Sequence, residues 1–395
     1  MSMTLTNDMY NAQSKLNRWY KKYSHQIIEI SGVIGTGTWE VVQAFIDDIG
    51  FDPREIMYLS YDQKQVIELA SKRYHAYYLN GIIYKYYRHV DLKSIPGISR
   101  YSKEINFRWE KDVRKKIDPK YRLIIVFDSV LLNHQTLSDL GSFGLPIILV
   151  RDPGLTPSPD SFTFLKDPNI ELRELHPELM KNPIVYFANK ALVGDKMTIG
   201  SYDTVSVVPK NRMNLYNMKS ADMIITMTED LSNNTNLIYR DKIMKFNPKY
   251  NYTGERVIVM NDLYGHKLVN EDEDRIRIYL TKGLVGNISK CNRHAAITKY
   301  IPIEFKTDFY YEPFTELYID RHYLNGVETP SRQIVPDEVL KIRYAYALPV
   351  ALTRLSHWDK VTVIANDIPE CDEAIYQKML YTAISRARSS MTLIV

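Results

Sequence analysis

A glycine-rich segment near the start of the chain has the composition of a phosphate-binding loop. It runs EISGVIGTGTW over residues 29–39 and continues the short apolar strand Gln26–Ile30. A helical pattern follows it through Ile46, and the free backbone N–H groups at the start of such a helix attract anions. Residues 32–37 are predicted to form a glycine-rich turn that joins the strand to the helix. Residual binding of a nucleotide phosphate through these N–H groups is the alternative.

Two positions of this loop carry the wrong side chains for hydrolysing ATP. In the pattern GxxxxGK[ST], the lysine reaches the β- and γ-phosphates and the hydroxyl binds Mg²⁺. Gly32 and Gly37 fit this pattern, but Thr38 replaces the lysine and Trp39 replaces the hydroxyl residue. Because charge stabilisation supplies most of the catalysis in phosphoryl transfer, we expect a large loss of turnover. Trp39 is expected to plug the nucleotide cleft, with packing in the core as the alternative.

Acidic residues follow two strongly apolar strands. Leu123–Phe127 ends in Asp128, and Leu145–Val150 is followed by Arg151 and Asp152. Continuous apolar runs of this kind are typical of central parallel strands, whose carboxyl ends line the ligand crevice of a sheet. The two carboxylates are therefore candidate site residues. For Asp128, capping of a neighbouring loop is the favoured interpretation and a role in the site is the alternative.

The hydrophobic patterns that position these residues predict an α/β fold. Further expected elements are helices at Met9–Tyr23, Gln65–Arg73 and Ala374–Ala383, and strands at Ile56–Ser60, Ala221–Thr226, Val257–Met260, Ile276–Leu280, Val361–Ala365 and Met391–Val395. A loop is expected at Pro153–Pro159.

Composition narrows the class of protein. The chain has 395 residues, 45% of them hydrophobic and 25% charged, as in ordinary soluble proteins with more than one domain. No apolar stretch is long enough for a membrane span, and Met1–Tyr10 is too polar for a signal peptide. Cys291 and Cys371 lack metal-ligand spacing, so reduced thiols, a cytoplasmic location and no bound metal are expected.

Positive charge is concentrated in one stretch. The net charge of the chain is +4, whereas Arg100–Arg122 alone carries nine Lys or Arg against four Asp or Glu. Such a stretch, interleaved with aromatic residues, suits a nucleic-acid backbone. A solvated charged face explains it equally well.

Read in order, these segments resemble the RecD-like superfamily 1 DNA helicases that large phages encode. The resemblance covers nearly the whole chain, and its most specific part is YTAISRAR over Tyr381–Arg388, similar to the arginine-finger block. It implies two RecA-like P-loop NTPase lobes, parallel sheets flanked by helices, with a small β-rich insertion in the second lobe. The implied domains are 1–165 with a pin-like insertion near 90–120, then 166–255 with 333–395, and a barrel-like insertion at 256–332.

Against this family's pattern, the catalytic residues are depleted. Ser129 stands where the family has a water-activating Glu, and Leu155 where it has a γ-phosphate-sensing Gln. The stretch 352–355 lacks the family's Lys-Ser-Gln-Gly, and the phosphate-binding Arg of the fourth block falls at Ser232. Only Arg386 of the catalytic set remains. It is expected to act as an ion-pair partner between the lobes instead of as an arginine finger.

The resemblance completes the set of candidate residues. The vestigial catalytic residues are Asp128, Asp152 and Arg386. The vestigial nucleotide-binding residues are Gln13, which would read adenine, and Gly32, Gly35, Thr36, Gly37, Thr38, Trp39, Ser129 and Arg386. The nucleic-acid-binding candidates are Lys64, Lys72, Arg73, Arg108, Lys115 and Lys116.

The leading functional hypothesis is a helicase homologue that does not hydrolyse ATP and acts as a nucleic-acid-binding or scaffolding protein in phage replication or assembly. The alternatives are an active ATP-dependent DNA helicase with an atypical nucleotide site, and a structural component that uses only the surface of the fold. Single-stranded or duplex DNA and a phage or host protein are the candidate partners, without a membrane. No cofactor is expected, and residual binding of ATP or ADP with Mg²⁺ is the alternative.

Overall fold

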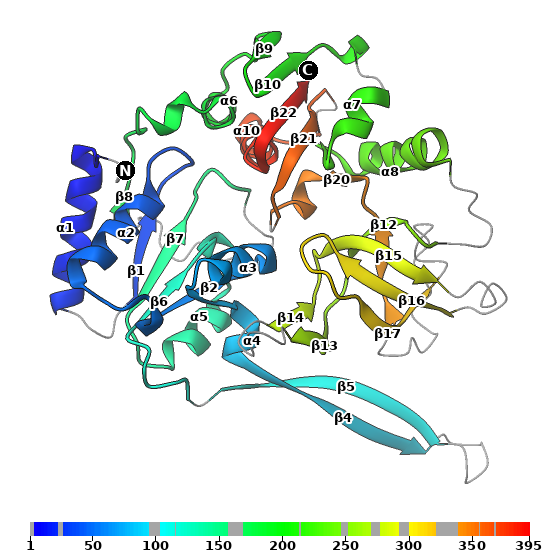
Figure 1. Cartoon of the computed structure of the whole chain (residues 1–395), viewed down its shortest axis with the longest axis horizontal. Helices are drawn as coiled ribbons and strands as arrows, with labels where there is room; N and C mark the ends of the chain where they lie inside the picture. The colour runs from blue at the N-terminus through cyan, green and yellow to red at the C-terminus, as the bar shows by residue number, and fades with distance from the viewer. Residues whose placement is uncertain are drawn as a thin grey trace. The chain divides into compact units, whose positions relative to one another are not determined.

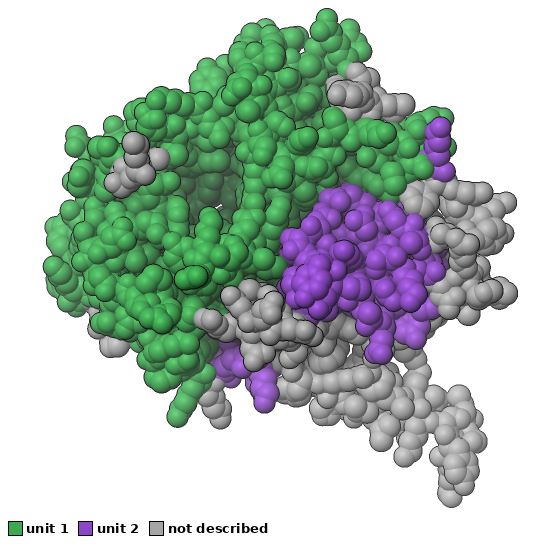
Figure 2. Space-filling view, in the orientation of Figure 1, with its two compact units in different colours: residues 1–79, 115–244, 346–395 green, residues 80–114, 245–345 purple. Residues whose placement is uncertain are grey.

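The computed structural model describes residues 4–22, 27–94, 103–114, 116–156, 169–212, 215–245, 252–269, 277–291, 300–320, 339–354, 356–366 and 369–395. These residues form two compact units (Figure 2). Unit 1 comprises residues 1–79, 115–244 and 346–395, and unit 2 comprises residues 80–114 and 245–345.

Unit 1 is built on two sheets, and the first is entirely parallel (Figure 1). Its strands lie in the order β3-β2-β6-β7-β1-β8. They are β1 (Ile27–Ser31), β2 (Ile56–Ser60), β3 (His75–Tyr78), β6 (Leu123–Val126), β7 (Ile147–Arg151) and β8 (Ile170–Glu171). Its helices are α1 (Asn7–Lys22), α2 (Thr38–Ile49), α3 (Gln63–Ser71) and α5 (His134–Gly141). Since β7 separates β1 from β6, the glycine-rich loop and Asp128 follow strands that are not neighbours.

The second sheet lies in the order β20-β11-β21-β22-β10-β9, and only the β9–β10 pair is antiparallel. Its strands are β9 (Gly200–Tyr202), β10 (Val205–Val208), β11 (Met223–Thr226), β20 (Ala347–Pro349), β21 (Trp358–Ile364) and β22 (Ala387–Ile394). The accompanying helices are α6 (Pro183–Leu192), α7 (Leu215–Ser220), α8 (Glu229–Ile238) and α10 (Glu373–Ile384).

Unit 2 is rich in β-structure. A long hairpin joins β4 (Tyr84–Ser94) to β5 (Lys103–Val113), and the short helix α4 (Leu79–Ile83) leads into it. A six-stranded sheet has the order β18-β17-β16-β15-β12-β19. Its strands are β12 (Arg256–Val259), β15 (Val285–Cys291), β16 (Tyr300–Thr307), β17 (Phe314–Asp320), β18 (Val339–Leu340) and β19 (Ile342–Tyr344), and β13 (Leu263–Val269) pairs separately with β14 (Arg277–Leu280).

The expected fold class is confirmed: the protein is α/β, with two helix-flanked, largely parallel sheets. The β-rich segment at residues 256–344 lies in the chain between β11 and β20 of the second sheet. Within the part of the chain that the structure describes, no helix is long and apolar enough to cross a membrane.

The core of the first sheet follows from helical periodicity. Helix α1 buries Met9, Ala12, Leu16 and Trp19, which recur every three or four residues and so lie on one face. This face packs with α2 and with strands β1, β2 and β6 in one apolar cluster. The packing fixes the helix that follows the glycine-rich loop against its sheet.

Candidate nucleotide site and inter-sheet contacts

The glycine-rich loop has the strand–turn–helix geometry that the sequence predicts. It begins where β1 ends at Ser31, and α2 starts at Thr38. Gly35 and Gly37 have φ of 96° and 82°, a region that favours glycine. A Cβ on Gly32 would lie 2.3 Å from the Thr36 hydroxyl oxygen, so this position also requires glycine.

Several polar groups of this loop are already bonded to other parts of the chain. The Ile34 N–H donates to the hydroxyl of Tyr381 over 2.7 Å, and Asn189 of α6 donates to the Ile34 carbonyl over 2.8 Å. The Gly35 carbonyl accepts the N–H of His176 over 2.7 Å. A phosphate that used the Ile34 N–H would have to displace Tyr381.

Tyr381 links the glycine-rich loop to Asp152, the acidic residue that follows β7. It lies near the end of α10, is fully buried, and donates its hydroxyl hydrogen to Asp152 over 2.6 Å. Its ring packs so closely on Gly154 that a Cβ there would lie 2.6 Å from a ring carbon. Burial raises the pKa of Tyr381 well above its ordinary value, so the hydroxyl stays protonated. Burial likewise raises the pKa of Asp152 to about 6.

More bonds join the segment after β7 to the second sheet's elements. The Thr156 N–H donates to the hydroxyl of Thr382 over 3.0 Å, and Arg354 donates through Nε to the Thr156 hydroxyl over 3.2 Å. Thr156 and Thr382 are both buried. Together with Tyr381, these residues hold the end of β7 against α10.

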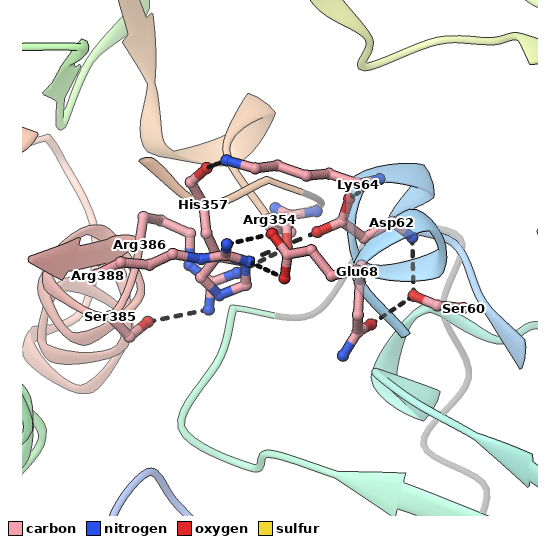
Figure 3. Close-up of polar contacts among 10 residues, drawn as sticks. Ser60, Asp62, Lys64, Glu68, Arg354, His357, Ser385, Arg386 and Arg388 are labelled. Carbon is pink, nitrogen blue, oxygen red and sulfur yellow. Dashed lines mark hydrogen bonds and ion pairs between the residues drawn. The ribbon is translucent and has the colours of Figure 1, made fainter. Parts of the chain in front are cut away.

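Arg386 does not make the ion pair predicted for it. It is 3% exposed and donates to the Arg354 carbonyl over 2.9 Å and to Ser385 Oγ over 3.1 Å (Figure 3). Among the described residues, no carboxylate lies within ion-pair distance of it, although Asp128 and Asp152 are close enough to raise its pKa. Burial outweighs them and lowers the pKa of Arg386. Unit 1 has two halves, one built on the first sheet and one on the second. The guanidinium is held by oxygen atoms of the second-sheet half, to which Arg386 itself belongs.

Arg388 makes an ion pair between the two halves. It lies on β22 and forms a two-pronged contact with Glu68 of α3, one arm of which measures 2.9 Å (Figure 3). About a third of each side chain is exposed, so solvent weakens the attraction. The sequence predicted an ion pair of this kind for Arg386, whereas the structure has it at Arg388, two residues later in the same motif.

A further polar contact between the halves involves Asp62 and His357. Asp62 caps α3 by accepting the N–H of Lys64 over 2.9 Å, and its other oxygen lies 3.7 Å from His357 Nδ1 (Figure 3). Neither of these two facing atoms has a hydrogen-bond partner among the described residues. Burial raises the pKa of Asp62 to about 6 and lowers that of His357 well below its ordinary value. Both groups therefore tend toward their neutral forms.

Trp39 packs into an aromatic cluster. Its ring centroid lies 5.3 Å from that of Phe127, 6.3 Å from Tyr58 and 6.4 Å from Tyr74. The side chain is partly buried against the core of the first sheet. Core packing describes these contacts better than a plug, because Tyr58 and Phe127 belong to the buried core and Tyr74 packs against it.

Other candidate nucleotide residues serve the fold. Gln13 donates to the Ala44 carbonyl over 3.1 Å and to Asp48 over 2.8 Å, which fastens α1 to α2. The Thr36 hydroxyl donates to the Val33 carbonyl inside the loop. Ser129 is buried in the short 3₁₀ turn after β6. Asp128 precedes that turn with φ 51°, and burial raises its pKa.

The nucleic-acid candidates are not all alike. Lys64 donates its ammonium to the His357 carbonyl over 3.1 Å, so it serves the contact between the halves. Lys72 and Arg73 are exposed at the end of α3, where Arg73 has φ 69°. Lys116 is exposed, Arg108 lies on β5 without a described side chain, and Lys115 lies outside the described residues.

Sequence reasoning did not foresee the main contacts of the site. Tyr381 and Thr382 belong to the YTAISRAR motif, which gives no sign of their partners, and no motif includes Asn189 or His357. Their partners lie 155 to 347 residues away in the chain. The one available hint was that Tyr381 and Arg386 share the most specific motif.

The chain is thus an α/β protein with two helix-flanked, largely parallel sheets, and residues that follow or flank both sheets meet at the glycine-rich loop. No protein-family model matches it, and no curated protein does. Solved structures that resemble it include the Pif1 helicase from Candida albicans, at 11% identity and a TM-score of 0.44, with 99% of this chain and 94% of that one covered. Bacteroides Pif1 bound to ssDNA has 13% identity and a TM-score of 0.43, with 99% and 92% covered. These values do not assign the chain to a family.

Proposed function

We propose that this chain is a helicase-like protein that does not hydrolyse ATP and that binds nucleic acid with the two sheets of unit 1 held in one arrangement. The observation that carries the proposal is the Tyr381 hydroxyl, which accepts the Ile34 N–H of the glycine-rich loop and donates to Asp152. These two bonds occupy a loop amide that a phosphate would need and join the halves that a motor must move.

The side chains around the loop support the loss of hydrolysis. Thr38 begins α2 where a lysine would neutralise the phosphates, and Ser129 stands where a carboxylate would activate water. Arg386 donates one hydrogen bond to the Arg354 carbonyl and one to Ser385 Oγ, and its Nε has no hydrogen-bond partner among the described residues.

Turnover of ATP, measured with and without a single-stranded oligonucleotide, tests the enzymatic half of the proposal. We expect that the oligonucleotide does not stimulate hydrolysis. The turnover rate should be far below about 1 s⁻¹, the lower end of the usual range for enzymes. Tyr381→Phe should free the Ile34 amide without restoring turnover, because the lysine and the water-activating acid are still missing. A DNA-stimulated rate above that level that Arg386→Ala abolishes would instead establish an active helicase with an atypical site.

The proposed binding of nucleic acid rests on the exposed pair Lys72 and Arg73 at the end of α3. Filter binding of a thirty-nucleotide oligothymidine at several salt concentrations measures it. Each phosphate contact to a single strand contributes about 0.7 to the slope of log affinity against log salt. Replacing both residues by Gln should therefore lower the slope by about 1.4, provided that each contacts one phosphate.

The matched control is Lys21→Gln with Lys22→Gln, an adjacent pair of exposed lysines at the end of α1. This double variant should leave the slope unchanged. Salt-insensitive or absent binding would favour a protein scaffold over a nucleic-acid binder. Equal effects of both pairs would mean that only net charge matters.

The resemblance to phage helicases extends the proposal to phage replication or assembly in the host cytoplasm.

A further inference from the structure

A hollow of about 210 Å³ lies on the six-stranded sheet of unit 2, over the strands β15, β16 and β17 (Figure 1). It is lined by side chains of Lys290 on β15, Pro302 and Glu304 on β16, and Glu316 and Tyr318 on β17. The residues between them on β16 and β17 are buried, so the hollow lies on the exposed face of the sheet. Its volume is below the roughly 300–1,000 Å³ of small-molecule sites, which suits a single side chain better than a whole ligand.

The pairing of the strands is irregular on both sides of Glu304. The register shifts between Ile288 and Lys290 where β15 pairs with β16. It shifts again between Ile303 and Phe305 where β16 pairs with β17, so that two residues of β17 lie opposite Glu304 alone. Bulges of this kind redirect side chains and occur often beside functional sites.

Glu316 is one of the two residues in the second bulge, and its backbone is strained. Its φ is 57°, a left-handed conformation that glycine adopts without cost and that glycine commonly supplies in a bulge. The side chain is exposed and forms no ion pair with any described residue. Strain that is kept at an exposed, charged position points to a role of the side chain beyond folding.

The hollow combines apolar walls with one uncompensated carboxylate. Tyr318 is 41% exposed and lies opposite Pro302 in the strand register. Glu304 is already held by Lys290 over 3.1 Å, whereas Glu316 is not paired in this way among the described residues. A long side chain with an apolar stem and a cationic head matches this distribution, because its stem contacts Pro302 and Tyr318 while its head reaches Glu316.

We propose that this hollow binds an arginine side chain of a partner protein, with the guanidinium group against the Tyr318 ring and the Glu316 carboxylate. Arginine fits better than lysine, because a planar guanidinium stacks on aromatic rings and forms two parallel hydrogen bonds with a carboxylate. Both recognising groups are accessible from solvent, so the side chain can enter without a rearrangement of the sheet.

Fluorescence anisotropy with the full chain and a labelled peptide tests this. The peptide carries three arginines spaced by Gly-Ser pairs, and two matched peptides carry lysine or uncharged citrulline at the same positions. We expect saturable binding of the arginine peptide. The lysine peptide should bind about threefold more weakly and the citrulline peptide about tenfold more weakly.

Two pairs of variants locate the binding. Glu316→Gln and Tyr318→Ala should each weaken binding of the arginine peptide by about five- to tenfold. The matched controls are Glu312→Gln and Tyr311→Ala, which change the same residue types just before β17 but outside the lining. These controls should leave the affinity unchanged.

Glu316→Gly separates binding from folding. Because glycine tolerates the positive φ at this position, the variant should unfold at a higher urea concentration than the wild type. It should nevertheless bind the arginine peptide about as weakly as Glu316→Gln does. Wild-type affinity in Glu316→Gly would exclude the carboxylate from the site.

The absence of saturable binding, equal affinities of the arginine and citrulline peptides, or equal effects of the variants and their controls would overturn the proposal. Equal affinities of the arginine and lysine peptides would overturn the choice of arginine. Since none of these measurements involves ATP or nucleic acid, their failure would leave the proposed function untouched.

Discussion

The hydroxyl of Tyr381 lies 2.6 Å from the Asp152 carboxylate, and this contact joins the last helix of the chain to the strand beside the glycine-rich loop. The same oxygen accepts the Ile34 N–H. Three chain segments, each from a different part of the sequence, therefore meet on one oxygen atom.

Tyr381→Phe tests the strength of this junction. The variant keeps the ring but leaves the Ile34 N–H and Asp152 without their shared partner, so we expect a loss of about 1–3 kcal/mol in the free energy of unfolding. Hydrogen exchange of the Ile34 amide should become faster. Tyr376→Phe, which removes a hydroxyl elsewhere on α10, is the control and should not affect that amide. Unchanged exchange of Ile34 in Tyr381→Phe would mean that the bond does not protect the loop.

Gly154→Ala tests the packing beneath the same ring. The added Cβ would lie 2.6, 2.7 and 3.0 Å from three Tyr381 ring carbons, so the ring must shift. Overpacking of this kind costs about 1–3 kcal/mol, measurable by urea unfolding. Gly141→Ala is the matched control, because nothing lies within 4 Å of its new Cβ. In a Tyr381→Ala background the Gly154 substitution should cost far less; an undiminished cost would exclude the ring as its cause.

Asp62 predicts a specific dependence of stability on pH. Its pKa is about 6 in the folded chain and 3.8 ordinarily, so the folded state binds the proton more tightly. Its contribution to the free energy of unfolding therefore rises as the pH falls from 7 through 6 towards 4, by about 2–3 kcal/mol. The pKa of His357 is lowered on folding, so its effect is the opposite. As the pH falls below 6.5, the ordinary pKa of histidine, its contribution to the free energy of unfolding decreases.

The contribution of Asp62 is isolated by comparing the wild-type chain with Asp62→Asn over this pH range. The difference in unfolding free energy should move in favour of the wild type as the pH falls. The same comparison with His357→Gln should move the other way. Parallel curves for all three proteins would show that neither group changes its pKa on folding.

The ion pair between Glu68 and Arg388 is expected to contribute little to stability. Each side chain is about one-third exposed, so a double-mutant cycle with Glu68→Gln and Arg388→Gln should give a coupling of at most about 1 kcal/mol. The coupling should fall as salt is added. A larger, salt-independent value would require that the pair is shielded from solvent in solution.

Local patterns predicted the framework of unit 1 well. The strand expected at Ile56–Ser60 has those bounds, and the helix expected at Met9–Tyr23 is found at Asn7–Lys22. Apolar periodicity determines such elements because each must bury one face or stripe. The turn at residues 32–37 was equally predictable, since its glycines reflect positive φ and close contacts.

The site itself was much harder to predict. Which groups meet the Ile34 backbone depends on α6 and α10, and no local pattern specifies contacts over such distances. Trp39 illustrates the same limit, because a tryptophan beside a ligand loop can face either the cleft or the core. Its neighbours Phe127, Tyr58 and Tyr74 decide this, and they come from three other segments. The domain boundaries drawn from the resemblance remain a prediction.

The place of β22 in the second sheet has a consequence for the order in which the protein folds during its synthesis. This strand, at residues 387–394, pairs with β21 on one side and with β10 on the other. Every strand of the first sheet has left the ribosome long before, whereas β10 must wait with an unpaired edge until the last strand appears. Such an edge invites pairing with other chains. A ribosome halted before residue 387 should therefore carry a nascent chain whose first sheet is folded and whose second sheet is still open.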